Sequence, residues 1–201
     1  MTAGAVGRYA FPKFGKKVVF LTADYAYGHE MVRGFQRAGK DFGIETLADI
    51  RHPIGASDFT AFLPRIQSLA PDVLLLYTAR QAGGDVFEGV VGGTSYYWRL
   101  EDTVPSAKAF NDKFRAANGG AVPSDYGALG YAGVRSVLEA VKAGKSIETE
   151  KVIGAMRGLK YDWYKGPQYY RACDHQSVQS VLIVESKHKD QKDKNDVFSV
   201  V

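Results

Sequence analysis

The sequence predicts an α/β fold with a doubly wound parallel sheet, and three apolar runs in its first half support that prediction. The runs are "KVVFLTA" (17–23), "IETLADIRH" (44–52) and "PDVLLLYTA" (71–79), each bounded by polar residues or turn formers. The first and third are continuously apolar at their centres, which is typical of parallel strands buried on both faces. A β-α-β-α-β order then joins three parallel strands through right-handed crossovers.

Two helical patterns separate these runs. Residues 26–42 carry apolar side chains at spacings of three and four, and Gly43 ends the pattern. Ser57 is expected to cap the second helix, ahead of an apolar face. Pro64 conflicts with a straight helix there, so we expect a kink or a short turn before the helix proper. That face comprises Phe59, Phe62, Leu63, Ile66 and Leu69.

The second half follows a different order. "DVFEGVVGGTSYYW" (85–98) is interpreted as one long strand broken by Gly92 and Gly93. Helices are expected over 104–118, over 124–143 and within "IETEKVIGAMRGL" (147–159), and "GPQYYRACDHQSVQSVLIVES" (166–186) predicts a turn and a final strand. Three successive helices would then have no sheet of their own to cover, although amphipathic helices need an apolar surface.

Composition limits the classes of function. Of 201 residues, 45% are hydrophobic and 24% charged, which is the profile of a globular domain rather than a disordered chain. The net charge is +4, but "KHKDQKDK" near the C-terminus mixes both signs and indicates a solvated tail, so nucleic acid is not expected as a partner. No membrane-length apolar run or secretory signal is recognisable, which by itself predicts a cytoplasmic chain.

Residues that could support catalysis or metal binding are scattered. The single cysteine, Cys173, excludes a multi-cysteine metal site, and the four histidines show no ligand spacing. "CDHQ" (173–176) is interpreted as a turn, since neighbours in sequence do not make a triad. The glycines of "GGDVFEGVVGG" match no phosphate-binding fingerprint. We therefore expect no cofactor, no metal and no enzyme.

The stretch "FLTADYAYGHEMVRGF" (20–35) contains the candidate site. An apolar run ends, and Asp24, Tyr25 and Tyr27 follow at the start of a helix. Open α/β sheets bind ligands at this edge, beyond the carboxyl ends of their strands. The alternative is that both tyrosines only cover a core. Asp24 is interpreted as a helix cap or dipole partner rather than a ligand contact.

Five segments, in order, resemble the periplasmic substrate-binding proteins of ABC importers, and most closely their branched-chain amino-acid-binding branch. They are "KKVVFLTADYAYGHEMVRGF", "DFTAFLPRIQSLAPDVLLL", "FEGVVGGTSYYW", "PSDYGALGYAGVRSVLEAV" and "RACDHQSVQSVLIVE". The resemblance implies two doubly wound lobes of the type I binding-protein fold, joined by hinge strands and closing on a small ligand. It also implies a periplasmic location and an ABC permease as partner.

Two parts of that family pattern have no match in the sequence. The first lobe's sheet should precede "RYAFPKFGKK", and a helix, a strand and a loop with an acidic residue should separate "YTARQ" from "AGGDVFEGV". We therefore interpret 1–97 as a second-lobe-like β/α lobe that includes a hinge strand. Residues 98–160 become a helical segment resembling part of the first lobe, and 161–201 a return strand to the β/α lobe with a polar tail.

The resemblance also implies ligand contacts. Tyr27, before a glycine, matches a position that faces the cleft, with Tyr25 at the rim. A second cleft aromatic falls at Ala79, where Arg80 could bind a carboxylate instead, and Tyr126 matches a wall position from the other lobe. The implied ligand is a branched-chain or aromatic amino acid, an amide or an aromatic acid, with binding impaired by the missing parts.

One other class of function stays open from the residues alone. A single-lobe domain resembling flavodoxin or receiver proteins would act as an interaction or nucleotide-binding module, but it would not carry the segment 104–160. In either case the helix with Val134, Leu138 and Val141 lacks a sheet to cover. We therefore expect exposed apolar surface and self-association.

Overall fold

The computed structural model describes residues 2–56, 58–77, 88–188 and 190–201. The chain forms two compact units: unit 1 is Met1–Gly93 with Ile183–Val201, and unit 2 is Thr94–Leu182. These limits differ from the division expected at residues 97 and 160. In particular, residues 161–182 lie in unit 2 rather than with the β/α lobe.

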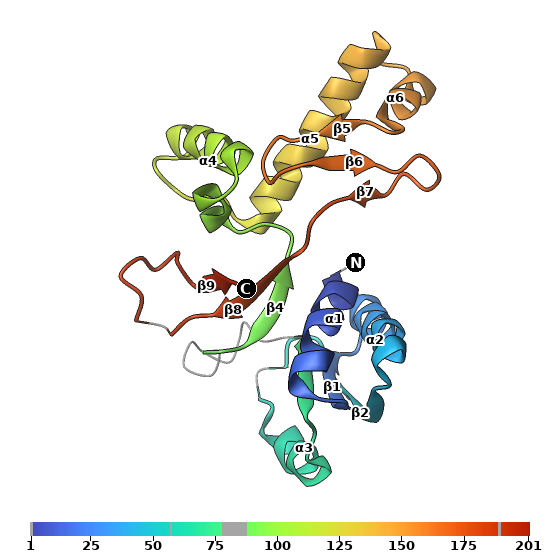
Figure 1. Cartoon of the computed structure of the whole chain (residues 1–201), viewed down its shortest axis with the longest axis vertical. Coiled ribbons are helices and arrows are strands. Elements are labelled where there is room, and N and C mark those ends of the chain that lie inside the picture. Colours follow the sequence, from blue (N-terminus) through green and yellow to red (C-terminus); the bar gives the residue numbers. More distant parts are fainter. Residues whose placement is uncertain (1, 57, 78–87, 189) are drawn as a thin grey trace. The chain divides into compact units, whose positions relative to one another are not determined.

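Unit 1 is built on a three-stranded parallel sheet. Its strands are β1 (Lys17–Ala23), β2 (Glu45–His52) and β3 (Val73–Tyr77), in the order β2-β1-β3 (Figure 1). Both pairs are parallel, with Phe20 of β1 beside Asp49 on one side and Leu75 on the other. The predicted α/β class and the parallel order of these three strands are therefore confirmed.

Helices cover both faces of this sheet. Alternate residues of β1 point to opposite sides, so its apolar side chains need cover on both. Val18 and Phe20 pack in one cluster with residues of α1 (Thr2–Phe14) and α2 (Ala26–Gly39). Val19 and Leu21 pack in a second cluster with α3 (Leu63–Leu69). A 3-10 helix over Thr60–Phe62 precedes α3, and Pro64 lies in its first turn, so the expected short turn is confirmed. Ser57, the expected cap, lies outside the described residues.

Helix α1 was not predicted, although its pattern is present in the sequence. Its buried residues recur at helical spacing over two turns: Ala3, Val6, Gly7, Ala10 and Phe11. Pro12 and two glycines conceal the pattern, because both residue types lower helix propensity. Packing against α2 overrides that propensity, and the Phe11 and Phe35 rings meet edge to face at 6.5 Å.

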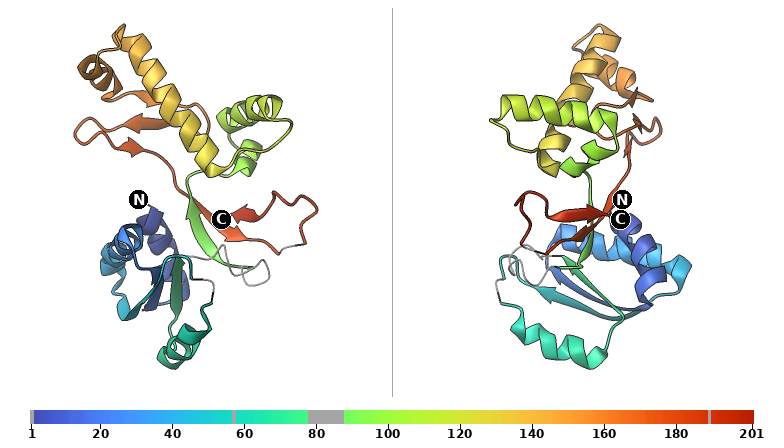
Figure 2. Two further views of the ribbon diagram at one scale, coloured as in Figure 1. Left: turned by 180° about the vertical axis from the view of Figure 1, so that it is seen from behind. Right: turned by 60° about the vertical axis from the view of Figure 1, so that its left-hand side comes forward.

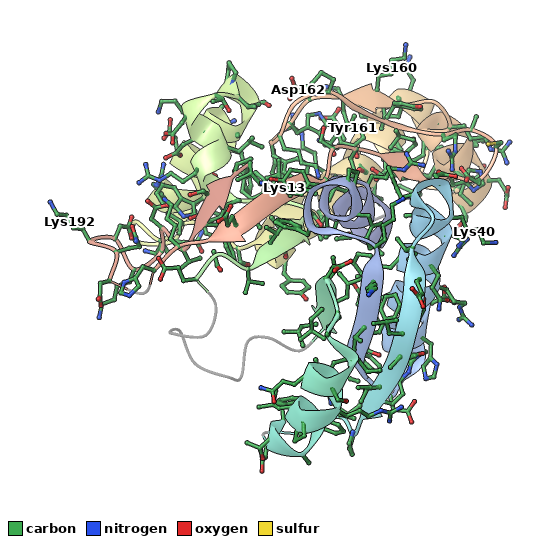
Figure 3. The ribbon with its side chains drawn as sticks, turned by 60° about the horizontal axis from the view of Figure 1, so that its bottom comes forward. Lys13, Lys40, Lys160, Tyr161, Asp162 and Lys192 are labelled. Atoms are coloured by element: carbon green, nitrogen blue, oxygen red, sulfur yellow. The ribbon has the colours of Figure 1, made fainter. Side chains whose placement is uncertain are left out.

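A second small sheet corrects two expectations for unit 1. It joins β4 (Val91–Thr94), β8 (Leu182–Ser186) and β9 (Phe198–Val200) in the order β4-β8-β9. The long strand expected over 85–98 is wrong in its described part, 88–98, where the strand is only four residues long and contains Gly92 and Gly93 rather than being broken by them. The C-terminal segment is not only a polar tail, because β9 pairs antiparallel with β8. Lys192, between the two strands, projects away from the ribbon (Figure 3).

Unit 2 contains three helices and a sheet that the sequence did not predict. A 3-10 helix over Trp98–Asp102 leads to α4 (Pro105–Ala117), α5 (Asp125–Gly144) and α6 (Thr149–Met156). The strands β5 (Lys160–Tyr161), β6 (Gln168–Tyr170) and β7 (Ser177–Val178) form an antiparallel sheet along which α5 lies (Figure 2). The expectation that these helices have no sheet of their own is therefore wrong. Strands of two or three residues are too short to show a period.

Aromatic rings form the core of unit 2. Tyr96 packs against Phe110 and Tyr164, each at 5.6 Å between ring centroids, and Phe110 also contacts Tyr131 at 4.7 Å. On β5, Tyr161 is buried while its neighbour Lys160 extends outward (Figure 3). The last three residues of the segment expected as a strand are Tyr96–Trp98. They are buried and belong to this core.

Candidate functional site

The turn between β1 and α2 holds the predicted site residues at the carboxyl edge of the parallel sheet. The backbone N–H of Asp24 donates to the carbonyl of His52, which ends β2, at 2.8 Å. Tyr25 is the N-cap residue of α2, with an extended backbone and no capping bond from its side chain. The Tyr25 carbonyl accepts from the N–H of His29 at 3.1 Å. The turn is thereby tied both to the sheet and to the helix.

Gly28 is required by a close backbone approach in this turn. A Cβ at position 28 would lie 2.2 Å from the carbonyl oxygen of Ala23. No side chain fits in that space, so glycine allows the first turn of α2 to start directly over the end of β1. Tyr25 and Tyr27, which flank this turn, take their positions from it.

The Tyr25 and Tyr27 rings stack on each other and face outward. Their centroids are 6.2 Å apart with an interplanar angle of 29°. They are 37% and 46% exposed, although tyrosine in a core is ordinarily covered. Neither ring is therefore enclosed in a core, although more than half of each side chain is covered. The pair instead presents apolar ring surface with two hydroxyl groups at the sheet edge.

Asp24 does not cap the helix, because Tyr25 occupies the N-cap position. The Asp24 carboxylate instead lies 2.8 Å from Nε2 of His29, one turn into α2. Both side chains are well exposed, so this ion pair contributes little to stability. Asp24 precedes Tyr25 in the turn, and its contact with His29 is one that the sequence did not indicate.

The topology identifies where on this edge a ligand would bind. The chain passes from β1 to β2 on one side and then to β3 on the other, so the strand order reverses between β1 and β3. In open α/β sheets ligands bind at this switch point. The Asp24–Tyr27 turn follows β1 there, and β3 ends at Tyr77, whose register partner is Thr22. Ala79 and Arg80, the other predicted contacts, come two and three residues after the end of β3 in the sequence and lie outside the described residues.

Tyr126, the predicted contact from the other lobe, lies in unit 2 at the start of α5. Its side chain is 76% exposed. The neighbouring Asp125 accepts a hydrogen bond from the hydroxyl of Thr94 at 2.9 Å, and Ser124 caps the helix by accepting from the N–H of Gly127 at 3.1 Å. The start of α5 is therefore fixed in unit 2, and the Tyr126 ring projects from it.

Lys165 is a buried cation that sequence reasoning missed. It is 5% exposed, and its Nζ donates to the carbonyls of Ser95 at 2.7 Å and Ser180 at 2.9 Å. Burial lowers the pKa of Lys165 to about 8, and the charge of Asp125 opposes that shift. Ser95 follows β4 and Ser180 precedes β8, so one ammonium ties together both segments that lead to the unit boundary. A lysine in "WYKGP" carries no signal for this role.

The "CDHQ" segment forms the predicted turn between β6 and β7. Asp174 pairs with Arg171, with a 2.8 Å bond to its Nε, and Nε2 of His175 accepts from Nε of Arg157 at 3.2 Å. Cys173 is exposed. A cavity of about 150 Å³ beside the turn is lined by Ile153, Met156, Tyr170 and His175. Ligand pockets usually measure roughly 300–1,000 Å³, so this cavity is not a candidate.

Two features of the described residues bear on the class of protein. No group of three or more His, Cys, Asp or Glu side chains in them could hold a metal ion. Among the helices described, none combines the length and the apolar character needed to cross a membrane.

Comparison with known proteins now gives the family. The sequence pattern of the family described as "Periplasmic binding protein" matches residues 1–82 and 77–193. The chain belongs to the periplasmic binding protein family. The match includes both units, so the single-lobe, flavodoxin-like reading is not supported.

Individual relatives agree with this membership. "Leu/Ile/Val-binding protein homolog 6" of Brucella abortus is 24% identical over 203 residues, covering 83% of this chain and 52% of the relative. An amino acid ABC transporter substrate-binding protein from Pseudomonas fluorescens has a TM-score of 0.86 at 24% identity, covering 100% of this chain and 63% of its own. A solute-binding protein from Rhodopseudomonas palustris, solved with 3,4-dihydroxybenzoic acid, has a TM-score of 0.80 at 23% identity, with 99% and 62% covered.

The chain is thus similar to only part of these proteins. It spans about half the length of the curated relatives that it matches and about three fifths of the solved structures. The incomplete binding-protein lobe expected from the sequence agrees with this partial coverage. At these identities the solved structures establish the fold alone.

Proposed function

We propose that this chain is the solute-binding component of an ABC-type importer and holds a small amino acid or a related carboxylate, aromatic acids included. The observation that carries the proposal is the exposed, stacked Tyr25–Tyr27 pair at the switch point of the unit 1 sheet. The role is to bind the ligand without changing it. An ABC permease partner and a periplasmic location accompany this proposal, as they do in the family.

The chemistry of this edge suits an apolar carboxylate. Tyrosine rings offer an apolar face for an aliphatic or aromatic group, and their hydroxyls can donate to a carboxylate. Arg80, which follows β3 in sequence, is proposed to pair with the carboxylate through its fork of donors. Asp24, beside the tyrosines, is available to an ammonium group when His29 releases it. The same edge can therefore accept an amino acid or an aromatic acid.

The relatives support this range of ligands without selecting one. The Brucella relative is named for leucine, isoleucine and valine, and the Rhodopseudomonas protein was solved with 3,4-dihydroxybenzoic acid. Both ligand types combine a carboxylate with an apolar body. The resemblance implies an aromatic residue at position 79, and the smaller side chain of Ala79 is proposed to favour the bulkier aromatic acids.

We expect the given 201 residues on their own to bind with low affinity. Small-molecule sites enclose most of the ligand surface, and this chain spans about three fifths of the solved relatives. Each missing charged hydrogen bond costs roughly 1.5–3 kcal/mol. The loss of two or three such bonds takes a micromolar site to millimolar or weaker, at about 1.4 kcal/mol per factor of ten.

Ligand-observed NMR at millimolar concentration, backed by calorimetric titration, tests the proposal with leucine, phenylalanine and 4-hydroxybenzoate. Tyr27→Ala should abolish the saturation-transfer signal of the ligand that binds. Tyr169→Ala is the matched control, because Tyr169 is 42% exposed on β6 of unit 2 and takes no part in the proposed site. A signal that survives Tyr27→Ala would contradict the proposed site.

Arg80 and Tyr126 each have a test of their own. Arg80→Gln should lower the affinity for carboxylate ligands and leave the affinity for the corresponding amides unchanged, because only the charge interaction is lost. Tyr126→Phe keeps the ring and removes the hydroxyl, whereas Tyr126→Ala removes both. A loss of binding with Tyr126→Ala alone would assign this ring a packing contribution. Unchanged affinity in both variants would remove Tyr126 from the proposed site.

A further inference from the structure

The chain passes between its two units twice, and the two connections are attached to unit 2 in different ways. The outgoing connection leaves unit 1 after Gly93, and the return connection re-enters it at Ile183. The strands β4 and β8, from which these connections extend, are neighbours in one sheet (Figure 1). Their attachments within unit 2 therefore decide how freely each connection can move.

The outgoing connection is fixed as soon as it enters unit 2. Strand β4 ends at Thr94, whose hydroxyl donates to the Asp125 carboxylate at the start of α5 at 2.9 Å. Ser95 alone then separates the strand from Tyr96, which is 1% exposed and packs in the aromatic core. This connection has attachments to unit 2 on both sides of Ser95.

The return connection contains a longer stretch outside the strands. Strand β7 ends at Val178 and β8 begins at Leu182, so the three residues Gln179–Val181 belong to neither strand. They are exposed or half-buried. The Tyr164 hydroxyl reaches the Gln179 side chain at 3.4 Å, which is long for a hydrogen bond. The firmer attachment described for this stretch is the 2.9 Å bond from Lys165 Nζ to the Ser180 carbonyl.

The backbone around Lys165 is anchored in unit 2. Tyr164, before it, is 1% exposed and packs in the aromatic core. After it, the N–H of Gly166 donates to the hydroxyl oxygen of Ser106, in the first turn of α4, at 3.1 Å. The Lys165 side chain therefore extends from a fixed base and bonds both connections through a single nitrogen.

The Lys165 ammonium is held at a cost in hydration. Both of its acceptors are neutral carbonyls. The carboxylate of Asp125 acts on it electrostatically but is bonded to the hydroxyl of Thr94. Burial lowers the pKa of Lys165 to about 8, because the low-dielectric surroundings disfavour the charged form. Release of the side chain into water restores its hydration, which offsets part of the loss of the two hydrogen bonds.

We propose that Lys165 is a clasp that holds the return connection to unit 2, and that this clasp opens while the outgoing connection stays fixed. In the closed state, one nitrogen joins the carbonyls of Ser95 and Ser180 at 2.7 and 2.9 Å. In the open state, Gln179–Val181 lose that attachment and can change their backbone angles. Hinges in proteins are formed by a few such residues at the ends of elements. The proposal does not depend on ligand binding.

Backbone ¹⁵N relaxation of the 201-residue chain tests the clasp. Lys165→Met removes the ammonium and keeps an apolar side chain of similar length. The order parameters of Gln179–Val181 should fall from about 0.85 to below about 0.6, whereas those of Thr94–Tyr96 should stay near 0.85. Lys160→Met is the matched control, because Lys160 is exposed on β5 of the same unit (Figure 3). The control should change neither connection.

A second measurement uses the unmodified chain and therefore does not depend on how Lys165→Met folds. Relaxation dispersion should detect opening on the microsecond-to-millisecond timescale at Gln179–Val181 and not at Thr94–Tyr96. Dispersion that is absent from Gln179–Val181, or equal in the two connections, would overturn the proposal. Equal loosening of both connections in Lys165→Met would overturn it as well, because Lys165 would then support unit 2 as a whole. Unchanged order parameters in that variant would show that the ammonium holds neither connection.

Discussion

Units 1 and 2 obtain their cores in different ways. In unit 1 one strand supplies the centre: the six residues of β1 from Val18 to Ala23 are each at most 3% exposed. In unit 2 the centre is a group of aromatic rings joined by buried polar groups. Tyr96 donates to Asn111 Oδ1 at 2.6 Å, and Asn111 donates to Glu101 at 2.7 Å. Unit 1 is organised by a sheet with two covered faces, and unit 2 by a network.

The polar network in unit 2 specifies one arrangement. Asn111 also donates to the carbonyl of Trp98 at 2.8 Å. Arg115 donates two hydrogen bonds to the Glu101 carboxylate, at 2.8 and 2.7 Å. The hydrogen bonds from Arg115 lower the pKa of Glu101, and burial raises the pKa of Tyr96. Buried polar groups tolerate few alternatives, because each must find its partner. The network holds the 3-10 helix against α4 while one face of α5 stays uncovered.

The largest expected effect is in the unit 1 core. Phe20→Ala removes a fully buried ring that lies 6.3 Å from the Phe35 ring, and should destabilise unit 1 by roughly 3–5 kcal/mol. Leu138→Ala on the exposed face of α5 should change stability by no more than about 0.5 kcal/mol. Hydrogen exchange of β1 and α5 peptides at low protein concentration measures both. Equal losses would mean that α5 is as deeply packed as β1.

The next effect concerns the buried lysine of unit 2. The folded pKa of Lys165, about 8, lies below its ordinary value of 10.5. Above pH 8 the folded chain therefore releases this proton before the unfolded chain does, and stability rises with pH. The penalty of the buried charge is fully present below pH 8. Between pH 7 and 9.5 the gain should be about 2 kcal/mol, at 1.36 kcal/mol per pKa unit.

Lys165→Met is the comparison variant, since methionine keeps much of the side-chain length without a titrating group. Urea unfolding followed by tryptophan fluorescence reports unit 2, because both tryptophans, Trp98 and Trp163, lie in it. The wild type should gain stability relative to Lys165→Met across pH 7–9.5. Parallel profiles for the two proteins would contradict the lowered pKa of the lysine.

The elements of unit 1 were easier to predict from the sequence than those of unit 2. The strands of unit 1 were predictable because "KVVFLTA" and "VLLLY" are continuously apolar, and burial on both faces demands that pattern. In unit 2, β5 and β7 are two residues each and leave no periodic signal. Helix α1 was missed because Pro12 and its glycines lowered the apparent propensity, although its apolar spacing was present.

The candidate site was predictable to the same extent. The Asp24–Tyr27 turn lies at the end of a recognisable strand, so its position at the sheet edge followed from the pattern. The pairing of Asp24 with His29 could not be predicted from the sequence, because capping is the commoner role of an aspartate at the start of a helix. Lys165 lies in a loop, and its partners Ser95 and Ser180 are 70 and 15 residues away. No local pattern encodes such a contact.

The smallest effects compare two helical glycines and should have opposite signs. Gly28→Ala places a methyl group 2.2 Å from the Ala23 carbonyl oxygen, so the start of α2 must shift. We expect it to destabilise unit 1 by roughly 1–3 kcal/mol and to separate the Tyr25–Tyr27 pair. Gly130→Ala adds a methyl group in open space and should stabilise α5 by up to about 1 kcal/mol. Thermal melting measures both changes. A destabilising Gly130→Ala would mean that a contact within the chain already fills the space.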